Sequence, residues 1–508
     1  STPSNSSAAS DVYKRQTGYG GGIASYYSDI SISNNYISNN QVSNGSGGGI
    51  YIARNNSDII GNTISENSAT SGGGIFTLNS NVNIQENEII NNTVQQEGGG
   101  IYDTTSVLII DGNLIDHNTS INGNGGGIVC KLSENIQILN NDITNNNSPA
   151  NGGGIFANWT VINILDNTIN RNMGKYGGGI YLKNSIQENI TKNEIRNNRA
   201  SIGGGIYSAN SNITKIVANK IEENSTIDSE SLGQGGGIYI ASTENPSIMD
   251  NIFTENSSST DGAGIFALDC SRIKLMNNTI VSNSATGFGG GLYLENSSIL
   301  VGNSIVYWNS PEEIKSIGST VYIAYSDVMS EGIDVDEASS LTEGEGFISS
   351  EPLFADEFFN LELESPCIDA GAESIYVSIW DVTVYGNQSD MYGVLRPQLD
   401  GWDIGALEYE ASEILAQDNH KPEKMDLIAY PNPFNSEVNV QVTCNAGDNI
   451  QIEVFDMMGK KVQTLFSGQA PSDNFNSRWN ADNNQSGTYI IKYSSPNSVN
   501  QQKINLIK

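Results

Sequence analysis

The stretch Gly152-Gly153-Gly154-Ile155 returns, intact or with one change, eleven times between Gly20 and Leu292. Successive copies lie 25 to 32 residues apart, and seven of the ten gaps are 26 or 27 residues. The apolar residues that close the copies are Ile23, Ile50, Ile75, Ile101, Ile128, Ile155, Ile180, Ile206, Ile238, Ile265 and Leu292. A nearly fixed period in this range is typical of stacked repeats, in which each unit contacts only its neighbours.

Each repeat also contains a pair of asparagines in the pattern Asn-x-apolar-x-x-Asn. Ten repeats have this pair: Asn35/Asn40, Asn62/Asn67, Asn87/Asn92, Asn113/Asn118, Asn141/Asn146, Asn167/Asn172, Asn193/Asn198, Asn219/Asn224, Asn251/Asn256 and Asn278/Asn283. An aliphatic residue lies three positions before each first Asn, often with another two residues earlier, as in Ile136 and Ile138. Spacing by two marks short strands with one buried face, so we predict three short strands per repeat, separated by turns.

One such coil leaves its aliphatic face uncovered, so the coils must stack with equivalent residues one strand spacing apart. We therefore predict an all-β protein whose residues 17–310 form a right-handed parallel β-helix. At ~4.8 Å per coil, the glycine-marked coils extend over roughly 50 Å. Glycine suits corners that need a positive φ or a close approach of backbones. Asparagine suits the other corners, where stacked amides form ladders.

After residue 310 the repeat loosens, and residues 311–410 are expected to form irregular final coils and loops that cap the solenoid. Residues 411–424 are polar and are expected to be a linker. From 425 to 508 the sequence changes to clean alternation, as in Val438-Asn-Val-Gln-Val442. About seven short strands in roughly 80 residues predict a small β-sandwich, with Gly459 in a hairpin turn.

The repeats resemble those of the bacterial right-handed β-helix families, within the pectate-lyase-like superfamily of folds. The resemblance covers residues 17–310 and rests on the glycine triplets and asparagine pairs quoted above. That superfamily includes polysaccharide lyases, hydrolases, epimerases, adhesins and passive stalks, so the resemblance implies a fold and leaves the activity open. The motifs Glu351-Pro-Leu-Phe354 and Asp403-Ile-Gly-Ala406 resemble the C-terminal part of secreted β-helix proteins, ahead of a variable surface anchor.

Residues 425–508 resemble the C-terminal sorting domain of the type IX secretion system. The resemblance rests on Tyr430-Pro-Asn-Pro-Phe434, Trp479-Asn-Ala-Asp482, Ser486-Gly-Thr-Tyr489 and the closing Lys503-Ile-Asn-Leu-Ile-Lys508. The residues of the implied sorting signal are Pro431, Asn432, Pro433, Gly459, Gly487 and Lys508. In that family the domain directs passage across the outer membrane and is then removed. The resemblance therefore implies a secreted or surface-attached protein that contacts the type IX machinery; release and lipopolysaccharide attachment both stay open.

Residues 1–16 do not fit the repeat that follows. The run Ser7-Ala-Ala-Ser-Asp-Val-Tyr-Lys-Arg-Gln16 looks like translated adapter sequence, and we expect the segment to be non-native. The first triplet then begins with no capping element before it, although a solenoid needs its end covered. We therefore expect the native N-terminus, with its signal peptide, to be missing.

The chain is strongly acidic, with 57 Asp and Glu against 24 Lys and Arg and a formal net charge of -33. This charge argues against nucleic acid and anionic membranes as partners, because both select basic surfaces. It also weighs against anionic polysaccharides, unless Ca²⁺ bridges the charges. With two histidines and four scattered cysteines, we expect no histidine metal site, no disulfide framework and no cofactor. No apolar stretch is long enough to cross a membrane, and we expect a monomer.

The residue after the Ile of each triplet is aromatic in nine of the eleven repeats. These candidate glycan-binding residues are Tyr51, Phe76, Tyr102, Phe156, Tyr181, Tyr207, Tyr239, Phe266 and Tyr293. Alternation along a strand predicts that this column points outward if the Ile points inward. Two interpretations then stand: a row of rings that binds sugars, or a self-packed stack that shields the sheet. If the alternation is reversed, the column belongs to the core.

Candidate residues for catalysis and metal binding are few. Asp103 occupies a register where neighbouring repeats carry Thr77 and Cys130. It is either a perturbed functional acid or a solvated residue on a strand that ends early. The candidate Ca²⁺ ligands are Asp334, Asp336, Asp400 and Asp403, for which ordinary turn chemistry is the alternative.

The even repetition favours a non-catalytic, surface-displayed or secreted module that contacts a polysaccharide or cell-surface glycan through its side, in the manner of an adhesin. Catalytic solenoids usually break their repeat with long loops, and the sizeable excess here is confined to Thr226–Leu232. The alternative is a polysaccharide lyase or glycoside hydrolase, with its site near that insertion or within residues 310–410. A passive surface spacer is the second alternative. Because the repeat is so even, we favour a protein that is not an enzyme.

Overall fold

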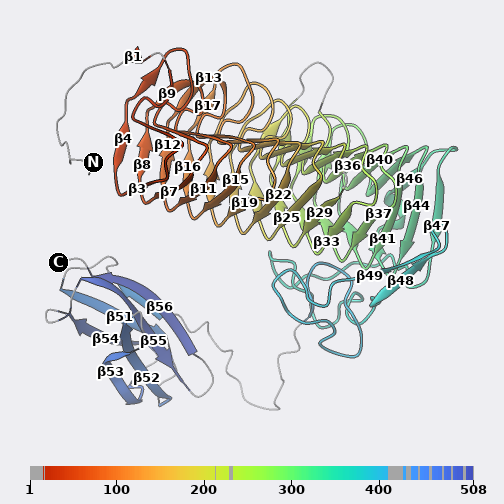
Figure 1. The fold of residues 1–508 in the computed structure, drawn as a ribbon. Helices are drawn as coiled ribbons and strands as arrows, with labels where there is room; N and C mark the ends of the chain where they lie inside the picture. The colour runs from red at the N-terminus through yellow and green to blue at the C-terminus, as the bar shows by residue number, and fades with distance from the viewer. Residues whose placement is uncertain are drawn as a thin grey trace. The chain divides into compact units, whose positions relative to one another are not determined.

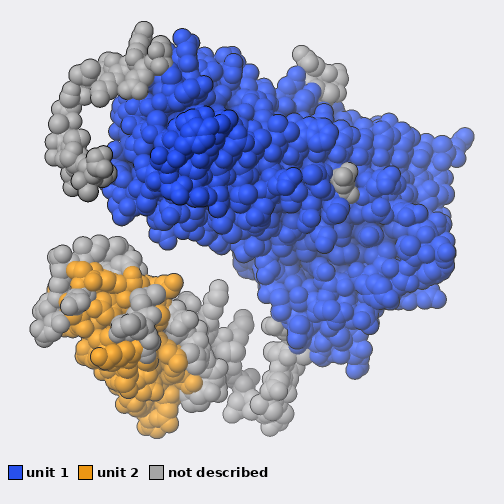
Figure 2. All heavy atoms as spheres, in the orientation of Figure 1, with its two compact units in different colours: residues 1–412 blue, residues 413–508 orange. Residues whose placement is uncertain are grey.

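The computed structural model separates the chain into two compact units, residues 1–412 and 413–508 (Figure 2). It describes residues 15–16, 18–211, 213–227, 233–409, 427–430, 436–443, 447–456, 460–471, 474–481, 484, 486–495 and 499–506. The linker expected at 411–424 lies outside these residues. Each unit is described by itself below.

The first unit is a right-handed parallel β-helix, as predicted (Figure 1). Each coil contributes one strand to each of three long parallel sheets. Sheet 1 contains β2 (Ile23–Tyr26), β6 (Ile50–Ala53), β10 (Ile75–Leu78), β14 (Ile101–Thr104), β18 (Ile128–Lys131), β21 (Ile155–Asn158), β24 (Ile180–Lys183), β28 (Ile206–Ala209), β32 (Ile238–Ala241), β36 (Ile265–Leu268), β40 (Leu292–Glu295), β43 (Ile314–Ile317) and β46 (Ile333–Val335). Its strands begin at the Ile or Leu that closes each glycine triplet, so the sequence repeat and the coil coincide.

Sheets 2 and 3 follow in the same coil order. Sheet 2 contains β3 (Ile30–Ser33), β7 (Asn56–Ile60), β11 (Asn81–Gln85), β15 (Val107–Asp111), β19 (Ile136–Leu139), β22 (Val161–Leu165), β25 (Gln187–Thr191), β29 (Thr214–Val217), β33 (Ser247–Met249), β37 (Ile273–Met276), β41 (Ser298–Gly302), β44 (Thr320–Ala324) and β47 (Ser340–Glu343). Sheet 3 contains β4 (Tyr36–Ser38), β8 (Thr63–Ser65), β12 (Glu88–Ile90), β16 (Leu114–Asp116), β20 (Asp142–Thr144), β23 (Thr168–Asn170), β26 (Glu194–Arg196), β30 (Lys220–Glu222), β34 (Ile252–Thr254), β38 (Thr279–Val281), β42 (Ile305–Tyr307) and β45 (Asp327–Val328). The coils therefore continue past residue 310 to Glu343, with a short 3-10 turn, η1 (Ser330–Gly332), between β45 and β46.

Many coils have a fourth strand, so the expectation of three strands per coil is wrong for them. Sheet 4 lies between the second Asn corner and the glycine triplet, and it comes in two pieces. The first piece contains β1 (Arg15–Gln16), β5 (Gln41–Val42), β9 (Ser68–Ser71), β13 (Thr93–Glu97) and β17 (Thr119–Ser120); the second contains β27 (Arg199–Ala200), β31 (Ser225–Thr226), β35 (Ser257–Ser258) and β39 (Ser284–Ala285). These segments are mostly Ser, Thr and Ala without an aliphatic period. They pair because stacking brings the neighbouring backbones into register, which a pattern search for alternating aliphatics misses.

The core is a set of aliphatic columns inside the coil. In β6, Ile50 and Ile52 face inward and are fully buried, and their partners in β10 are Ile75 and Thr77. Isoleucine stacks on isoleucine in successive coils because parallel pairing in register places equivalent side chains one strand spacing apart. Cys130 lies in this core and is fully buried, as a small apolar residue would be.

Two asparagine ladders run along the coil at the corners that flank sheet 3. In the second ladder, the Asn172 amide donates to Asn198 Oδ1 at 3.1 Å and to the Ile143 carbonyl at 2.8 Å. Its own Oδ1 accepts from the backbone and side-chain amides of Asn146, both at 3.0 Å. The ladder ends at Asn309, whose amide donates to Glu313 Oε2 at 2.6 Å. Each asparagine inside the ladder therefore links its own coil to the coils before and after it, as the asparagine spacing predicted.

The glycine triplet packs one backbone against the next. A Cβ added to Gly153 would lie 2.5 Å from the Gly178 carbonyl oxygen of the following coil, and Gly152 has a φ of +67°. A side chain at the first position would be strained, and one at the second would collide with backbone. Glycine is therefore needed at this corner for two separate reasons.

After β47 the chain folds back along the side of the solenoid. Residues 344–409, called the C-terminal wrap below, include the antiparallel hairpin β48 (Ser374–Val377) and β49 (Val382–Tyr385). Ile375 and Val377 of the hairpin pack on Met276 and Leu300, on the outer face of sheet 2 (Figure 1). We expected loops that cap the solenoid; residues 344–409 instead cover the flank of the later coils, where they pack on Met276, Leu300, Ile252 and Ile305.

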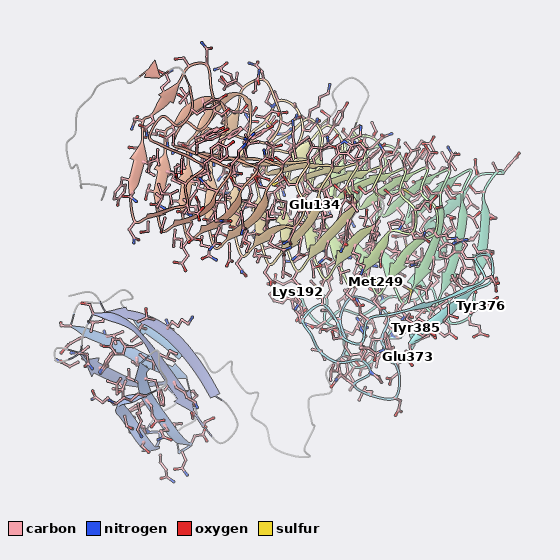
Figure 3. The ribbon with its side chains drawn as sticks, in the orientation of Figure 1. Glu134, Lys192, Met249, Glu373, Tyr376 and Tyr385 are labelled. Carbon is pink, nitrogen blue, oxygen red and sulfur yellow. The ribbon has the colours of Figure 1, made fainter. Side chains whose placement is uncertain are left out.

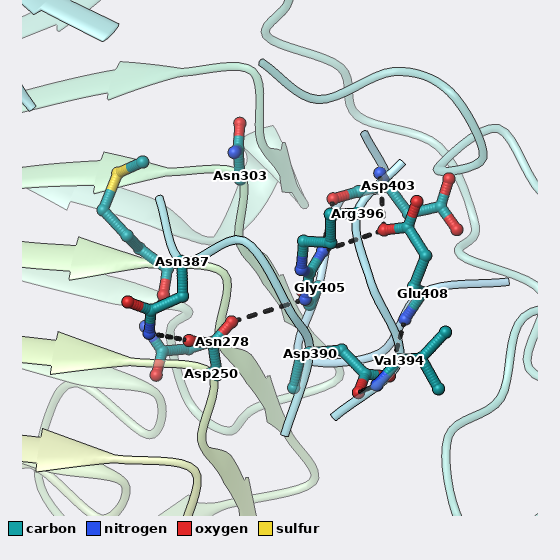
Figure 4. Close-up of polar contacts among 12 residues, drawn as sticks. Asp250, Asn278, Asn303, Asn387, Asp390, Val394, Arg396, Asp403, Gly405 and Glu408 are labelled. Atoms are coloured by element: carbon teal, nitrogen blue, oxygen red, sulfur yellow. Dashed lines mark hydrogen bonds and ion pairs between the residues drawn. The ribbon is translucent and has the colours of Figure 1, made fainter. Parts of the chain in front are cut away.

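A buried charge cluster fastens the C-terminal wrap to the coils (Figure 4). Arg396 Nη2 lies 3.4 Å from Asp250 Oδ1 of the solenoid, and Arg396 Nη1 lies 3.2 Å from Glu408 Oε2. All three side chains are buried. Burial raises the pKa of Asp250 and of Glu408 to about 7, although Arg396 opposes the shift at both. The Arg396 guanidinium therefore forms ion pairs with two carboxylates in a site that is buried from solvent.

The second unit is a seven-stranded β-sandwich, as predicted. One sheet contains β50 (Leu427–Tyr430), β51 (Glu437–Thr443) and β54 (Asn474–Asn480). The other contains β53 (Lys461–Gln469), β52 (Asn449–Asp456), β55 (Gly487–Ser494) and β56 (Val499–Leu506). Val438 and Trp479 of the first sheet are buried in one core with Ile452 and Ile491 of the second. Strands β52 and β53 pair antiparallel, with Phe455 opposite Lys461; Gly459, where a hairpin turn was expected, lies outside the described residues.

Candidate functional site

The aromatic column lies on the outer face of sheet 1, while the isoleucines beside it face the core. Its rings stack on one another from coil to coil: Tyr181 lies 5.1 Å from Phe156 and 4.8 Å from Tyr207, with planes within 11° of parallel. Seven of the nine side chains are only 1–9% exposed. The stack therefore shields the sheet and covers its own ring faces, which leaves mainly ring edges at the surface.

The stack is interrupted where the fifth coil carries Val129 in place of an aromatic residue. Lys131 covers this gap, with its Nζ 6.0 Å from the ring centre of Tyr102 and 5.4 Å from that of Phe156. The same ammonium pairs with Glu97 at 2.5 Å. A cation held over two ring faces replaces the missing ring contact.

Replacing Tyr181 by leucine is expected to lower the free energy of unfolding by about 1–2 kcal/mol, because two stacked ring pairs are lost while the outer face stays apolar. Urea unfolding of the full chain, followed by far-UV circular dichroism, measures the change. The matched control is Tyr36→Leu in β4, which is 87% exposed and should leave stability unchanged. Equal stability of the two variants would contradict a stabilising role for the stack.

Asp103 lies inside the coil, so the expectation of a solvated residue on a strand that ends early is wrong. Strand β14 continues to Thr104, and the Asp103 side chain is fully buried. Its carboxylate accepts hydrogen bonds from the hydroxyls of Thr77 and Ser133, and burial raises its pKa. The coil encloses this acid, which keeps it out of reach of a polysaccharide.

A second buried acid, Glu188, escaped the sequence interpretation. It replaces an aliphatic residue of sheet 2, since its partner in the preceding coil is Ile162. Glu188 accepts hydrogen bonds from Ser208 at 2.7 Å and Thr214 at 3.0 Å, and burial raises its pKa. The missing isoleucine at this position was the signal that could have revealed it.

The candidate Ca²⁺ ligands have other partners. Asp334 pairs with Lys315, and Asp336 accepts from Ser339 Oγ at 2.6 Å, a bond that lowers its pKa. Asp403 accepts from the backbone amide of Asp369 at 2.8 Å, while Asp400 is exposed. In the described part of the chain, no three His, Cys, Asp or Glu side chains are arranged to hold a metal ion.

A pocket of about 450 Å³ lies where the C-terminal wrap meets the last coils. Its lining, called the tyrosine pocket below, consists of Tyr322, Ala324, Tyr325, Glu345, Ser374, Ile375, Tyr376 and Thr383. Tyr322 comes from β44, and Tyr325 and Glu345 follow β44 and β47. Tyr376 comes from the hairpin (Figure 3). The pocket is therefore built from three segments that only the folded wrap brings together.

The tyrosine pocket combines aromatic surface with a few polar groups. Tyr325 Oη donates to Glu345 Oε2 at 2.8 Å, and Tyr376, which is 56% exposed, donates to Asp381 at 2.8 Å. The bond to Glu345 raises the pKa of Tyr325. The pocket has the volume, the aromatic lining and the few convergent polar groups that are typical of sites for small molecules or sugars. None of its residues is among the individual site residues predicted from sequence, although all of them lie within residues 310–410, where the enzyme alternative placed its site.

A second cleft, of about 390 Å³, lies at the edge of the C-terminal wrap. Its lining, called the step cleft below, consists of Asp166, Lys192, Asn193, Glu194, Ala218, Lys220, Met391 and Tyr392. Lys220 pairs with Glu222 at 2.7 Å, and Glu194 with Arg196 at 3.1 Å. Two carboxylates, two ammonium groups and a phenol meet here, and these are residue types that acid–base chemistry uses.

The sorting-signal residues fall mostly outside the described part of the chain. Gly487 begins β55 with a φ of +155°. The residues Pro431, Asn432, Pro433, Gly459 and Lys508 are not among the described ones. No helix long and apolar enough to span a membrane occurs in the residues that the structure describes.

Two family models match the chain. Residues 10–169 and 153–340 match the right handed beta helix region, and residues 428–507 match the secretion system C-terminal sorting domain. The protein thus belongs to the right-handed β-helix family and carries a type IX sorting domain at its C-terminal end. The sorting domain marks it for export by the type IX system to the cell surface or beyond.

One solved structure with some likeness is the enzymatically active domain of tailspike protein 2 of bacteriophage CBA120. It is 9% identical, with 89% of this chain and 72% of that chain covered and a TM-score of 0.23. A score this low supports no statement about this protein. A comparison with curated proteins finds no match.

Proposed function

We propose that this protein is a secreted or surface-attached glycan-binding module and that the tyrosine pocket contacts the sugar. The observation that carries the proposal is the pocket itself, which is lined by three tyrosines and one carboxylate. Apolar ring surface suits the C–H face of a sugar, and carboxylate and hydroxyl groups suit its hydroxyls. The stacked aromatic column supports this proposal less, because its ring faces are already covered.

The tyrosine pocket also favours binding over cleavage. Glycosidases need two carboxylates about 5–9.5 Å apart, one of which protonates the leaving group. The described lining of the pocket contains one carboxylate, Glu345, and its hydrogen bond with Tyr325 occupies an oxygen. A bound sugar would therefore meet a recognition surface and no acid–base pair.

Replacing Tyr376 by alanine is expected to weaken binding of the full chain to neutral polysaccharides about tenfold, because truncating an exposed aromatic anchor commonly costs more than 1 kcal/mol. Affinity electrophoresis on gels that contain glucans, mannans or xylans measures retention. Tyr36→Ala is the matched control, since Tyr36 is an exposed tyrosine of the first coils. Unchanged retention of the Tyr376 variant would refute the pocket, and absence of retention for the parent protein would indicate a spacer.

The step cleft supports a second candidate function, a polysaccharide-degrading enzyme. Asp166 and Glu194 provide the two carboxylates that the tyrosine pocket lacks, and Lys192 provides a base of the kind a lyase would need. New reducing ends or unsaturated sugars after incubation with the parent protein would establish cleavage. Their loss in a Glu194→Gln variant would place the chemistry in this cleft.

A further inference from the structure

The central coils are basic within an acidic protein. Residues 171–220 contain eight of the chain's 24 basic residues and two acidic ones, for a local net charge of 8 − 2 = +6. The basic residues are Arg171, Lys175, Lys183, Lys192, Arg196, Arg199, Lys215 and Lys220; the acidic ones are Glu188 and Glu194. Because Glu188 is buried, the surface of this band is more positive than its sequence.

A groove of about 550 Å³ borders this band, and four of its eleven lining residues belong to it. Its lining, called the cationic groove below, consists of Thr119, Ser120, Ile121, Asn147, Ser148, Pro149, Met173, Gly174, Lys175, Ser201 and Ile227. It coincides with the break in sheet 4 between β17 and β27, where Asn147 and Met173 form single bridges in place of strands. The break lets five successive coils contribute to one trough along the axis.

Three cations lie in or beside the cationic groove. Lys175 lines it, Arg199 is the bridge partner of Met173, and Arg171 precedes Met173 by two residues. Within the described residues, no carboxylate lies within 4.0 Å of any of the three. Asp228 and Glu230, which follow Ile227 in the sequence, lie outside those residues. Lys175 Nζ lies 5.6 Å from the ring centre of Tyr176, so one of the three charges faces a ring and none is paired with a described carboxylate.

The lining of the groove contains both apolar and polar residues. Ile121 is 44% exposed and Met173 is 46% exposed. In the outward column that contains Met173, the neighbouring coils carry Thr119 and Asn147 on one side. Ser120, Ser148 and Ser201 complete the lining, but they are only 1–4% exposed, and the Ser148 hydroxyl already donates to the Gly123 carbonyl at 2.7 Å. A chain that fits here needs apolar patches and negative charge.

The backbone along the groove is already paired. The amide of Ser120 donates to the Asn147 carbonyl at 3.0 Å, and that of Ser148 donates to the Met173 carbonyl at 2.9 Å. The Gly174 amide donates to the Arg199 carbonyl at 3.0 Å. An extended peptide that adds a strand needs free backbone groups of this kind. Recognition must therefore use side chains, which favours a hydroxyl-rich polymer over a peptide.

We propose that the cationic groove binds an anionic polysaccharide through its carboxylate or sulfate groups, with Lys175 and Arg199 as the paired cations. This site is separate from the tyrosine pocket, and it extends the proposed glycan-binding function to a charged class of glycan. The net charge of the whole chain disfavours such a ligand at long range. Salt screens that repulsion beyond roughly 8–10 Å under physiological conditions. The charges close to the groove therefore determine whether an anionic ligand is attracted at contact.

The test compares two doubly substituted full chains with the same change of charge. Lys175→Gln/Arg199→Gln removes the paired cations of the groove, and Lys215→Gln/Lys274→Gln removes two from the outward column of sheet 2. Binding to dextran sulfate, polygalacturonate and unmodified dextran is measured by affinity electrophoresis at about 50 and 300 mM salt. We expect the groove variant to lose at least tenfold in affinity for an anionic glycan and the control variant less than twofold.

The glycans distinguish the source of the negative charge. Retention by dextran sulfate alone assigns a sulfated ligand, and retention by polygalacturonate alone assigns a carboxylated one. Equal losses in both variants would overturn the proposal, since binding would then follow net charge. Stronger binding of polyglutamate than of either glycan, lost in the groove variant, would also overturn it and assign an acidic peptide.

Failure of this proposal is separable from failure of the tyrosine pocket. Tyr376→Ala should leave retention by anionic glycans unchanged, and the groove variant should leave retention by neutral glycans unchanged. Anionic retention that depends on Tyr376 and not on Lys175 and Arg199 would overturn the groove while supporting the pocket.

Discussion

Replacing Asn172 by alanine is expected to lower the free energy of unfolding of the β-helix by about 3–5 kcal/mol, because the change leaves several buried polar groups without partners. The Asn172 side chain makes two hydrogen bonds with Asn146 and one each with Ile143 and Asn198. Asn172 and these three partners are all fully buried. The backbone and side-chain amides of Asn146 would lose their acceptor. Urea unfolding of the full chain, followed by far-UV circular dichroism, measures the loss.

Asn170 provides a matched control in the same coil. It lies at the end of β23, is only partly buried, and its Oδ1 has no partner among the described residues. Asn170→Ala should therefore change the free energy of unfolding by no more than about 0.5 kcal/mol. If both substitutions cost the same, the ladders contribute no more than surface asparagines and the stacked isoleucines alone hold the coils in register.

Replacing Arg396 by methionine is expected to release the C-terminal wrap from the solenoid. The change leaves Asp250 and Glu408 buried without their cation, and breaking a buried pair in this way costs about 3–5 kcal/mol. Hydrogen exchange of peptides from residues 386–409 should become fast while the coils stay protected. The exposed Arg272→Met is the control, and it should leave exchange of the wrap unchanged.

The loss on replacing Arg396 should depend on pH. Burial raises the pKa of Asp250 and Glu408 to about 7 and that of Asp403 to about 6, above the values of the unfolded chain. The folded state therefore binds more protons between about pH 4 and pH 7, and stability falls as pH rises through that window. Because Arg396 lowers the pKa of both carboxyls, its removal raises them further. The folded variant must then hold protons that the unfolded chain releases, and this cost grows as the pH rises. The variant should be damaged more at pH 8, and parallel pH profiles of parent and variant would exclude this account.

The coil architecture followed from the sequence because each coil repeats the same local rule. An isoleucine after a glycine triplet, intact or with one change, such as Ile155, starts ten of the thirteen strands of sheet 1, and alternation places Phe156 outside. The fourth strand was missed because Ser and Thr carry no period of their own. The burial of Asp103 was also missed, because its column mixes apolar residues with polar ones such as Thr77 and Ser208, so the sequence did not show that the strand is enclosed.

The candidate sites could not be predicted in the same way. Tyr322 and Tyr376 belong to segments without a repeat, and the hairpin that carries Tyr376 reaches sheet 2 only through packing on Met276 and Leu300. Arg396 meets Asp250 from 146 residues away. The excess of basic residues in the central coils was present in the composition of that stretch, but the chain's net charge of -33 concealed it.

The sequence by itself determined the period of the coil, its isoleucine core, its asparagine corners and its export by the type IX route. Each of these is local or repeated, so eleven copies of one pattern or one terminal motif are enough to define it. Only the tertiary structure decided which surfaces can meet a ligand. The tyrosine pocket forms where the C-terminal wrap meets the last coils, and the cationic groove forms where five successive coils carry side chains that do not repeat. The repeat pattern predicts neither combination of side chains.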